Sequence, residues 1–261
     1  MSYNFELPFI PERSKKPRTE GLTMVMDKGL STRQAEDFIS ASGDYVDYVK
    51  LGFGTSMVSK NLVEKINLYK SNNIRPYLGG TLFEAFIVRN KFNEYLKLMD
   101  KLKLDMAEVS DGSIVMPHDK KCEYIHTLSK QLTVLSEVGS KEEGIIIHPA
   151  KWISMMKKEL DAGSFKVIAE ARESGNVGIF HRNGSAHSLL INKITSKIKK
   201  EDIIWETPQK SQQVYFIKLM GANVNVGNIA YEDVIPLETL RLGLRGDTFF
   251  TFLPEKLKVE L

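Results

Sequence analysis

Short strand-like runs alternate with longer amphipathic segments along almost the whole chain of 261 residues. Eight such runs are present, and glycine, asparagine or charged residues follow most of them. They span residues 22–26, 45–51, 75–78, 104–109, 132–136, 166–171, 203–206 and 224–226. Strand-like runs that alternate with helical segments predict parallel strands joined by right-handed crossovers.

The number of units separates the two main parallel architectures. An open doubly wound sheet is expected to contain fewer units and a glycine-rich phosphate loop near its start, and neither a GxGxxG motif nor a P-loop occurs here. Eight strand–helix units in a chain of this length instead predict a single (β/α)₈ TIM barrel over residues 21–261. Residues 1–20 carry Pro8, Pro11 and Pro17, which disfavour regular structure, and predict an arm that leads into the barrel.

Charge and cysteine content exclude several classes of partner. The formal net charge is only +3, from 36 basic and 33 acidic residues, which is too small an excess to indicate a nucleic acid or a membrane surface. Cys122 is the single cysteine, so no intrachain disulfide can form. We found neither a signal-peptide pattern nor an apolar run of membrane-spanning length. We therefore expect a cytoplasmic protein.

Acidic residues gather where the predicted strands end. Barrel enzymes carry their chemistry at the C-terminal ends of the strands, so these residues are expected to face one shared mouth. Magnesium binds oxygen ligands and uses one or two carboxylates together with water and substrate oxygens. The pool of candidate Mg²⁺ ligands is Glu108, Asp111, Glu137, Glu170 and Glu206.

Basic residues occupy the same strand ends, which indicates a small substrate with several negative charges. Arginine suits bidentate phosphate or sulfonate recognition, whereas lysine acts as a movable point charge. Gly80 and Thr81 open a predicted helix whose free N–H groups favour an anion. The basic candidates for this role are Lys28, Lys50, Lys141, Arg172, Lys210 and Arg245. Acids and bases at strand ends also form structural ion-pair networks. A purely structural role is therefore the alternative interpretation of these charged residues.

Several long motifs resemble those of the phosphosulfolactate synthase family, and the likeness runs from about residue 16 to residue 249. The motifs are 21–30 (GLTMVMDKGL), 50–56 (KLGFGTS), 79–84 (GGTLFE), 108–112 (EVSDG), 137–141 (EVGSK), 170–175 (EARESG), 206–213 (ETPQKSQQ) and 244–249 (LRGDTF).

The resemblance implies a (β/α)₈ barrel and a Mg²⁺-dependent addition of sulfite to carbon 3 of phosphoenolpyruvate, which gives (2R)-phospho-3-sulfolactate. It implies Lys141 as the catalytic lysine; the family often has a second lysine where this chain has Ser140. The product would feed coenzyme M synthesis or serve as a source of sulfolactate. We expect a lyase of the carbon–sulfur class, and a homo-oligomer.

Two other functions compete with this expectation. The family also contains plant heat-stress proteins without a clear claim to the activity, so a non-catalytic stress or interaction protein is one alternative. The other is a barrel aldolase or isomerase that acts on a phosphorylated substrate. An aldolase would need a Schiff-base lysine within a strand, and Lys50 is the candidate for it.

Overall fold

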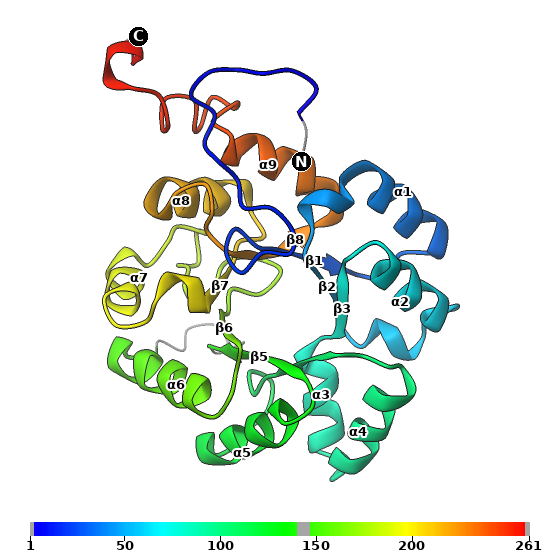
Figure 1. Ribbon diagram of the computed structural model, residues 1–261. Helices are drawn as coiled ribbons and strands as arrows, with labels where there is room; N and C mark the ends of the chain where they lie inside the picture. Colours follow the sequence, from blue (N-terminus) through cyan, green and yellow to red (C-terminus); the bar gives the residue numbers. More distant parts are fainter. Residues whose placement is uncertain (1–2, 140–146, 259–261) are drawn as a thin grey trace.

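The computed structural model describes residues 3–139 and 147–258, and these form a barrel of parallel strands surrounded by helices (Figure 1). The strands are β1 (Thr23–Asp27), β2 (Tyr48–Leu51), β3 (Arg75–Leu78), β4 (Met106–Val109), β5 (Thr133–Val138), β6 (Lys166–Ala169), β7 (Ile203–Glu206) and β8 (Val226–Ala230). The helices are α1 (Thr32–Ser42), α2 (Leu62–Ser71), α3 (Gly80–Ile87), α4 (Phe92–Lys101), α5 (His118–Ser129), α6 (Pro149–Asp161), α7 (Ser188–Thr195), α8 (Lys210–Met220) and α9 (Val234–Arg241).

Strand pairing confirms the predicted (β/α)₈ barrel. The strands are hydrogen-bonded in the order β3-β2-β1-β8-β7-β6-β5-β4, and β3 and β4, at the two ends of this order, lie next to each other. The predicted ranges of β3 and β7 match the structure, and the other six strands differ at one or both ends. Strand β5 continues to Val138, and β8 starts two residues later than expected, at Val226.

The inside of the barrel is filled by one apolar layer. Successive side chains of a strand point to opposite faces, so every second residue faces the barrel axis. Eight fully or almost fully buried side chains form this layer, seven from the strands and one from the residue before β1: Leu22, Met24, Tyr48, Tyr77, Met106, Leu135, Ile168 and Ile204. The layer closes the barrel from below and leaves the next inward-facing residue of each strand for the mouth.

A larger apolar core lies between the outer face of the strands and the helices. Outward-facing residues such as Val49, Val134 and Trp205 are fully buried there. Trp205 of β7 stacks on Phe216 of α8, with ring centroids 4.7 Å apart. In the part of the chain that the structure describes, no helix is both long enough and apolar enough to span a membrane.

The N-terminal arm packs against the base of the barrel. Arg13 donates to Glu238 of α9 at 2.8 Å and to the Ala222 carbonyl at 3.0 Å. Arg18 forms a buried ion pair with Asp47, just before β2, at 2.9 Å. The arm is therefore fixed to the barrel by buried charged contacts.

Candidate functional site

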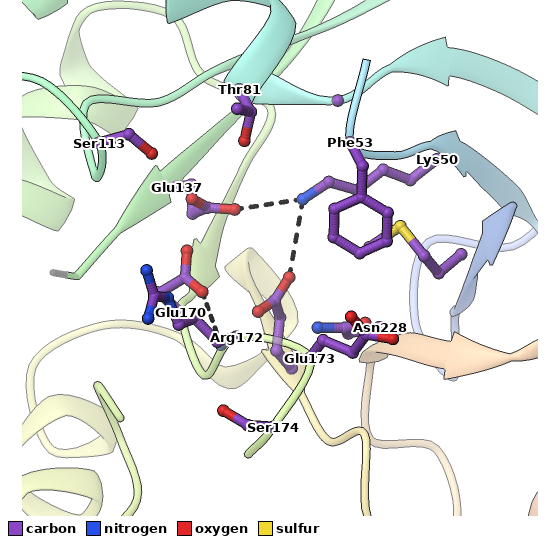
Figure 2. Close-up of a pocket in the computed structure, with 13 residues that line it drawn as sticks. Lys50, Phe53, Thr81, Ser113, Glu137, Glu170, Arg172, Glu173, Ser174 and Asn228 are labelled. Carbon is purple, nitrogen blue, oxygen red and sulfur yellow. Dashed lines mark hydrogen bonds and ion pairs between the residues drawn. The ribbon is translucent and has the colours of Figure 1, made fainter. Parts of the chain in front are cut away.

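A cavity of about 380 Å³ opens at the C-terminal ends of the strands (Figure 2). Its lining comes from loops and strand ends around the barrel: Met26, Lys50, Phe53, Gly79, Thr81, Ser113, Glu137, Glu170, Arg172, Glu173, Ser174, Glu206 and Asn228. The cavity lies where barrel enzymes place their active sites.

The charged residues of this cavity follow from the pleat of the strands. Two residues beyond each member of the apolar layer, the chain again points toward the barrel axis. On five strands that position carries a buried charged residue. The pairs of layer residue and charged residue are Tyr48 and Lys50, Met106 and Glu108, Leu135 and Glu137, Ile168 and Glu170, and Ile204 and Glu206. The charged residue of each pair therefore stands directly above the apolar layer.

Lys50 is the centre of this group. Its ammonium lies 2.8 Å from Glu108, 3.2 Å from Glu137 and 3.7 Å from Glu206. Figure 2 shows the side chain extended toward Glu137. Burial would lower the pKa of Lys50, but attraction by the three carboxylates outweighs it and raises the pKa well above its ordinary value. Lys50 is therefore a fixed positive charge at neutral pH.

Three of the carboxylates can converge on one point. Ligand oxygens of Glu137, Glu170 and Glu206 lie within 4.8 Å of one another, and all three residues are buried. Backbone amides orient two of them: Arg172 donates to Glu170 at 2.6 Å, and Ala171 donates to Glu206 at 3.1 Å. Buried carboxylates held this close are typical of a divalent cation site.

Burial disfavours the charged form of the carboxyl groups of Glu206 and Glu108 and raises their pKa. It raises the pKa of Glu206, and the negative charge of Glu137 raises it further. The pKa of Glu108 is raised by the same two causes, which outweigh the attraction of Lys50. The carboxylates therefore repel one another, and a cation placed among them would relieve that repulsion.

Gly139 makes room for one member of this group. Its φ of +146° is in a region that favours glycine, and a Cβ there would lie 2.5 Å from the Cβ of Glu170. Any side chain at this position would push Glu170 away from Glu137 and Glu206. The glycine that follows β5 is thus a requirement of the carboxylate cluster.

The loop after β6 forms one wall of the cavity and brings Arg172, Glu173 and Ser174 into its lining. Arg172 adopts a left-handed backbone conformation with φ of 57°. Two glutamines at the start of α8 hold the loop: Gln209 donates to the Ser174 carbonyl at 2.6 Å, and Gln212 donates to the Gly175 carbonyl at 2.6 Å.

The predicted substrate-binding residues occupy different positions. Lys50, Arg172 and Thr81 line the cavity. Lys28 is half exposed at the rim, where it pairs with Glu173. The Gly80 amide donates to Glu108 at 2.6 Å, so this N–H already binds a protein carboxylate.

Other predicted residues lie apart from the cavity lining or beyond the described chain. Lys210 pairs with Asp247 at 2.6 Å, and both side chains are partly exposed. The pKa of Asp247 is lowered mainly by its hydrogen bond with Lys210, and the positive charge of Arg245 lowers it further. Among the predicted metal ligands, Glu108 binds Lys50, and Asp111 binds Lys121 at 2.9 Å, away from the three-carboxylate cluster. Lys141 falls outside the described residues.

Two polar groups beside the cavity are not among the predicted site residues. Glu84 of α3 accepts hydrogen bonds from the Ser110 hydroxyl and, at 2.9 Å, from the Ser113 amide, so it shapes the loop that places Ser113 in the lining. Lys121 of α5 is fully buried behind β5. Neither carries a local signal, because Glu84 and Lys121 resemble the solvated charges of any amphipathic helix.

A family model described as "(2R)-phospho-3-sulfolactate synthase (ComA)" matches residues 11–247 of this chain. A phosphosulfolactate synthase from Methanothermobacter thermautotrophicus is 42% identical over 244 residues, covering 91% of this chain and 95% of that protein. A phosphosulfolactate synthase from Bacillus subtilis is 40% identical over 244 residues, covering 92% of this chain and 97% of that protein.

Two solved structures that share the fold are distant from this chain in sequence. The 3-hexulose-6-phosphate synthase of Salmonella typhimurium superimposes with a TM-score of 0.54 at 14% identity, covering 86% of this chain and 100% of that chain. Thiamine phosphate pyrophosphorylase from Pyrococcus furiosus gives a TM-score of 0.53 at 10% identity, covering 89% of this chain and 96% of that chain. At these identities the likeness supports the barrel fold alone.

Proposed function

The chain belongs to the phosphosulfolactate synthase family, and from this premise we propose that it adds sulfite to phosphoenolpyruvate with the help of Mg²⁺. The observation that carries the proposal is the buried cluster of Glu137, Glu170 and Glu206 beside Lys50 and Arg172 in one cavity. A cavity of about 380 Å³ suits two small anions. The proposal includes the carbon–sulfur lyase class, a cytoplasmic location and a homo-oligomeric state.

The charge of the cavity favours a divalent cation. Among the described residues of the site, the four carboxyl groups of Glu108, Glu137, Glu170 and Glu206 outnumber two basic groups, the ammonium of Lys50 and the guanidinium of Arg172. An anionic substrate would be repelled from such a site unless a cation joined it. Glu137, Glu170 and Glu206 fit this role because hard cations prefer carboxylate oxygens. When bound, Mg²⁺ supplies Lewis-acid stabilisation of charge that develops on the substrate carboxylate.

The reaction forms one carbon–sulfur bond and needs one proton. The sulfite sulfur attacks carbon 3, and the electron pair of the double bond moves through carbon 2 toward the carboxylate. The positive charges of Lys50 and Arg172, which line the cavity, offset the repulsion between the two anions. A lysine then delivers a proton to carbon 2 as general acid, and we assign this role to Lys141.

The geometry of Lys50 argues against the aldolase alternative. A Schiff base requires a neutral amine, and the pKa of Lys50 is raised well above its ordinary value by the three neighbouring carboxylates, which outweigh the effect of burial. Lys50 is therefore suited to stabilise negative charge and not to form a covalent bond with the substrate.

Direct product analysis tests the proposed function. Incubation of the purified protein with phosphoenolpyruvate, sulfite and Mg²⁺ is expected to give phosphosulfolactate, detected by mass spectrometry. Omission of sulfite, or addition of excess chelator, is expected to abolish the product. If no product forms at high protein concentration with Mg²⁺ present, the proposal is wrong and the non-catalytic alternative gains support.

The assignment of the proton donor makes a separate prediction. Lys141→Ala is expected to lower kcat by about 10²–10⁴-fold, the usual contribution of general acid catalysis. Lys151→Ala changes an exposed lysine in the first turn of α6, ten positions further along the chain; it is the matched control and is expected to keep the activity. Turnover of Lys141→Ala within about tenfold of the parent protein would assign the proton to another group.

A further inference from the structure

Lys121 joins three neighbouring units of the barrel from behind the cavity. It extends from α5, and its side chain is fully buried. The ammonium donates to the carbonyl of Glu137 at 2.6 Å and to the carboxylate of Asp111 at 2.9 Å, and it lies 2.8 Å from Glu159 of α6. One side chain thus connects the loop after β4, the end of β5 and the helix that follows β5.

The Glu137 carbonyl occupies a special place in the sheet. The carbonyls of Val134 and Val138 accept from Phe165 and Glu170, on the β6 side. In a parallel strand alternate residues bond to opposite neighbours, so the carbonyl of Glu137 is directed toward β4. The register between β4 and β5 ends at Val109 and Ser136, one residue before Glu137. Lys121 therefore supplies a donor at the point where the strand ladder stops.

The surroundings keep Lys121 charged and fixed. Burial would lower its pKa, but the attraction of Glu159 and Asp111 outweighs this and raises the pKa. His118 lies 3.7 Å from Glu159, but burial lowers the pKa of this histidine and favours its neutral form. Lys121 is therefore the group that balances the charge of Glu159. The carboxylates of Glu159 and Asp111 hold its ammonium in place.

From these contacts we propose that Lys121 is a positioning residue for the metal cluster. By holding the Glu137 backbone, it sets where the Glu137 carboxylate stands relative to Glu170 and Glu206, and so it sets the affinity for a divalent cation. Lys121 itself touches neither the cation nor the substrate. The inference rests on the proposed function, because it requires that the cluster binds a metal.

Metal binding measured by calorimetry tests this role without reference to turnover. Lys121→Met is expected to weaken Mg²⁺ binding by about tenfold or more, the usual effect of losing a group that orients a metal ligand. The matched control is Lys65→Met. Lys65 is also a buried helical lysine, and it binds Asp27, the last residue of β1, and the Leu30 carbonyl, each at 2.7 Å. This control is expected to lose heat stability while it keeps its Mg²⁺ affinity.

A second variant covers the case in which Lys121→Met does not fold. The double variant Lys121→Met, Glu159→Met removes both charges, which avoids leaving a buried carboxylate without its counter-charge. It is also expected to bind Mg²⁺ about tenfold more weakly, or worse.

The outcomes separate the inference from the function on which it rests. Mg²⁺ affinity of the parent protein is measured first, and no binding there contradicts the proposed metal site itself. If the parent protein binds Mg²⁺ and a folded Lys121 variant binds it equally well, the positioning role is wrong. Equal weakening in Lys65→Met also overturns it, because general loosening of the barrel would then explain both results.

Discussion

Lys50→Met is expected to lower kcat/KM for sulfite addition by about 10³-fold or more. The ammonium of Lys50 is within 4 Å of three buried carboxylates, and methionine would leave them without this charge. The buried glutamates would then take up protons or move apart, which changes the cation site and the anion site together. The measurement is steady-state kinetics with saturating Mg²⁺.

Two further variants test whether the loss of activity in Lys50→Met comes from the missing ammonium group or from lower stability. Lys50→Arg keeps a positive charge but places a planar group where an ammonium contacts Glu108 and Glu137, so it is expected to recover only a small part of the activity. Lys65→Met removes a buried lysine elsewhere and controls for stability. If folded Lys50→Met retains more than a tenth of the parent activity, Lys50 is not the electrostatic centre of the site.

Glu206→Gln is expected to raise the Mg²⁺ concentration needed for half-maximal activity by about 10²-fold, with kcat recovering in part at high Mg²⁺. Glutamine has nearly the same shape and keeps an oxygen that can accept the Ala171 amide, which is 3.1 Å from Glu206. What is lost is one negative charge of the three-carboxylate cluster. Activity titrated against Mg²⁺ measures the effect, and metal binding by calorimetry checks it independently.

Glu238→Gln is the matched control for this variant. Glu238 is also a buried glutamate, but it binds Arg13 at the base of the barrel, at the opposite end from the cavity. Its substitution is expected to lower the melting temperature and to leave the Mg²⁺ dependence unchanged. An unchanged Mg²⁺ dependence in Glu206→Gln would remove Glu206 from the proposed ligand set.

The barrel was predictable from the sequence because each strand and each helix carries its own pattern. Runs such as 75–78 and 203–206 were placed at the bounds that the structure gives for β3 and β7. Strand β5 was predicted to end at Ser136, before two residues that belong to it. Glu137 is predicted to follow the strand, but it lies inside β5, where its carboxylate is 3.2 Å from the ammonium of Lys50.

The charged residues at the mouth were predictable only as a pool. Alternation along the strands brings Lys50 and the four glutamates to the barrel axis, and this follows from position in the chain. Which way a loop carboxylate turns does not follow from position. Asp111 is two residues past β4 and was grouped with the metal ligands, but it turns to Lys121 on the next helix. The local sequence around Asp111 does not indicate that its partner is a lysine on the next helix.

The clasp between Arg13 and Glu238 joins residues 225 positions apart and lies at the base of the barrel. Strand β1 likewise bonds to β8, and the Gly21 amide donates to the Asn223 carbonyl. During synthesis on the ribosome, the first strand therefore has to wait for the last before either has its full set of neighbours. Contacts so distant in sequence make closure of the barrel a late step. We expect the emerging chain to expose apolar surface, and to need protection from aggregation, until α9 has left the exit tunnel.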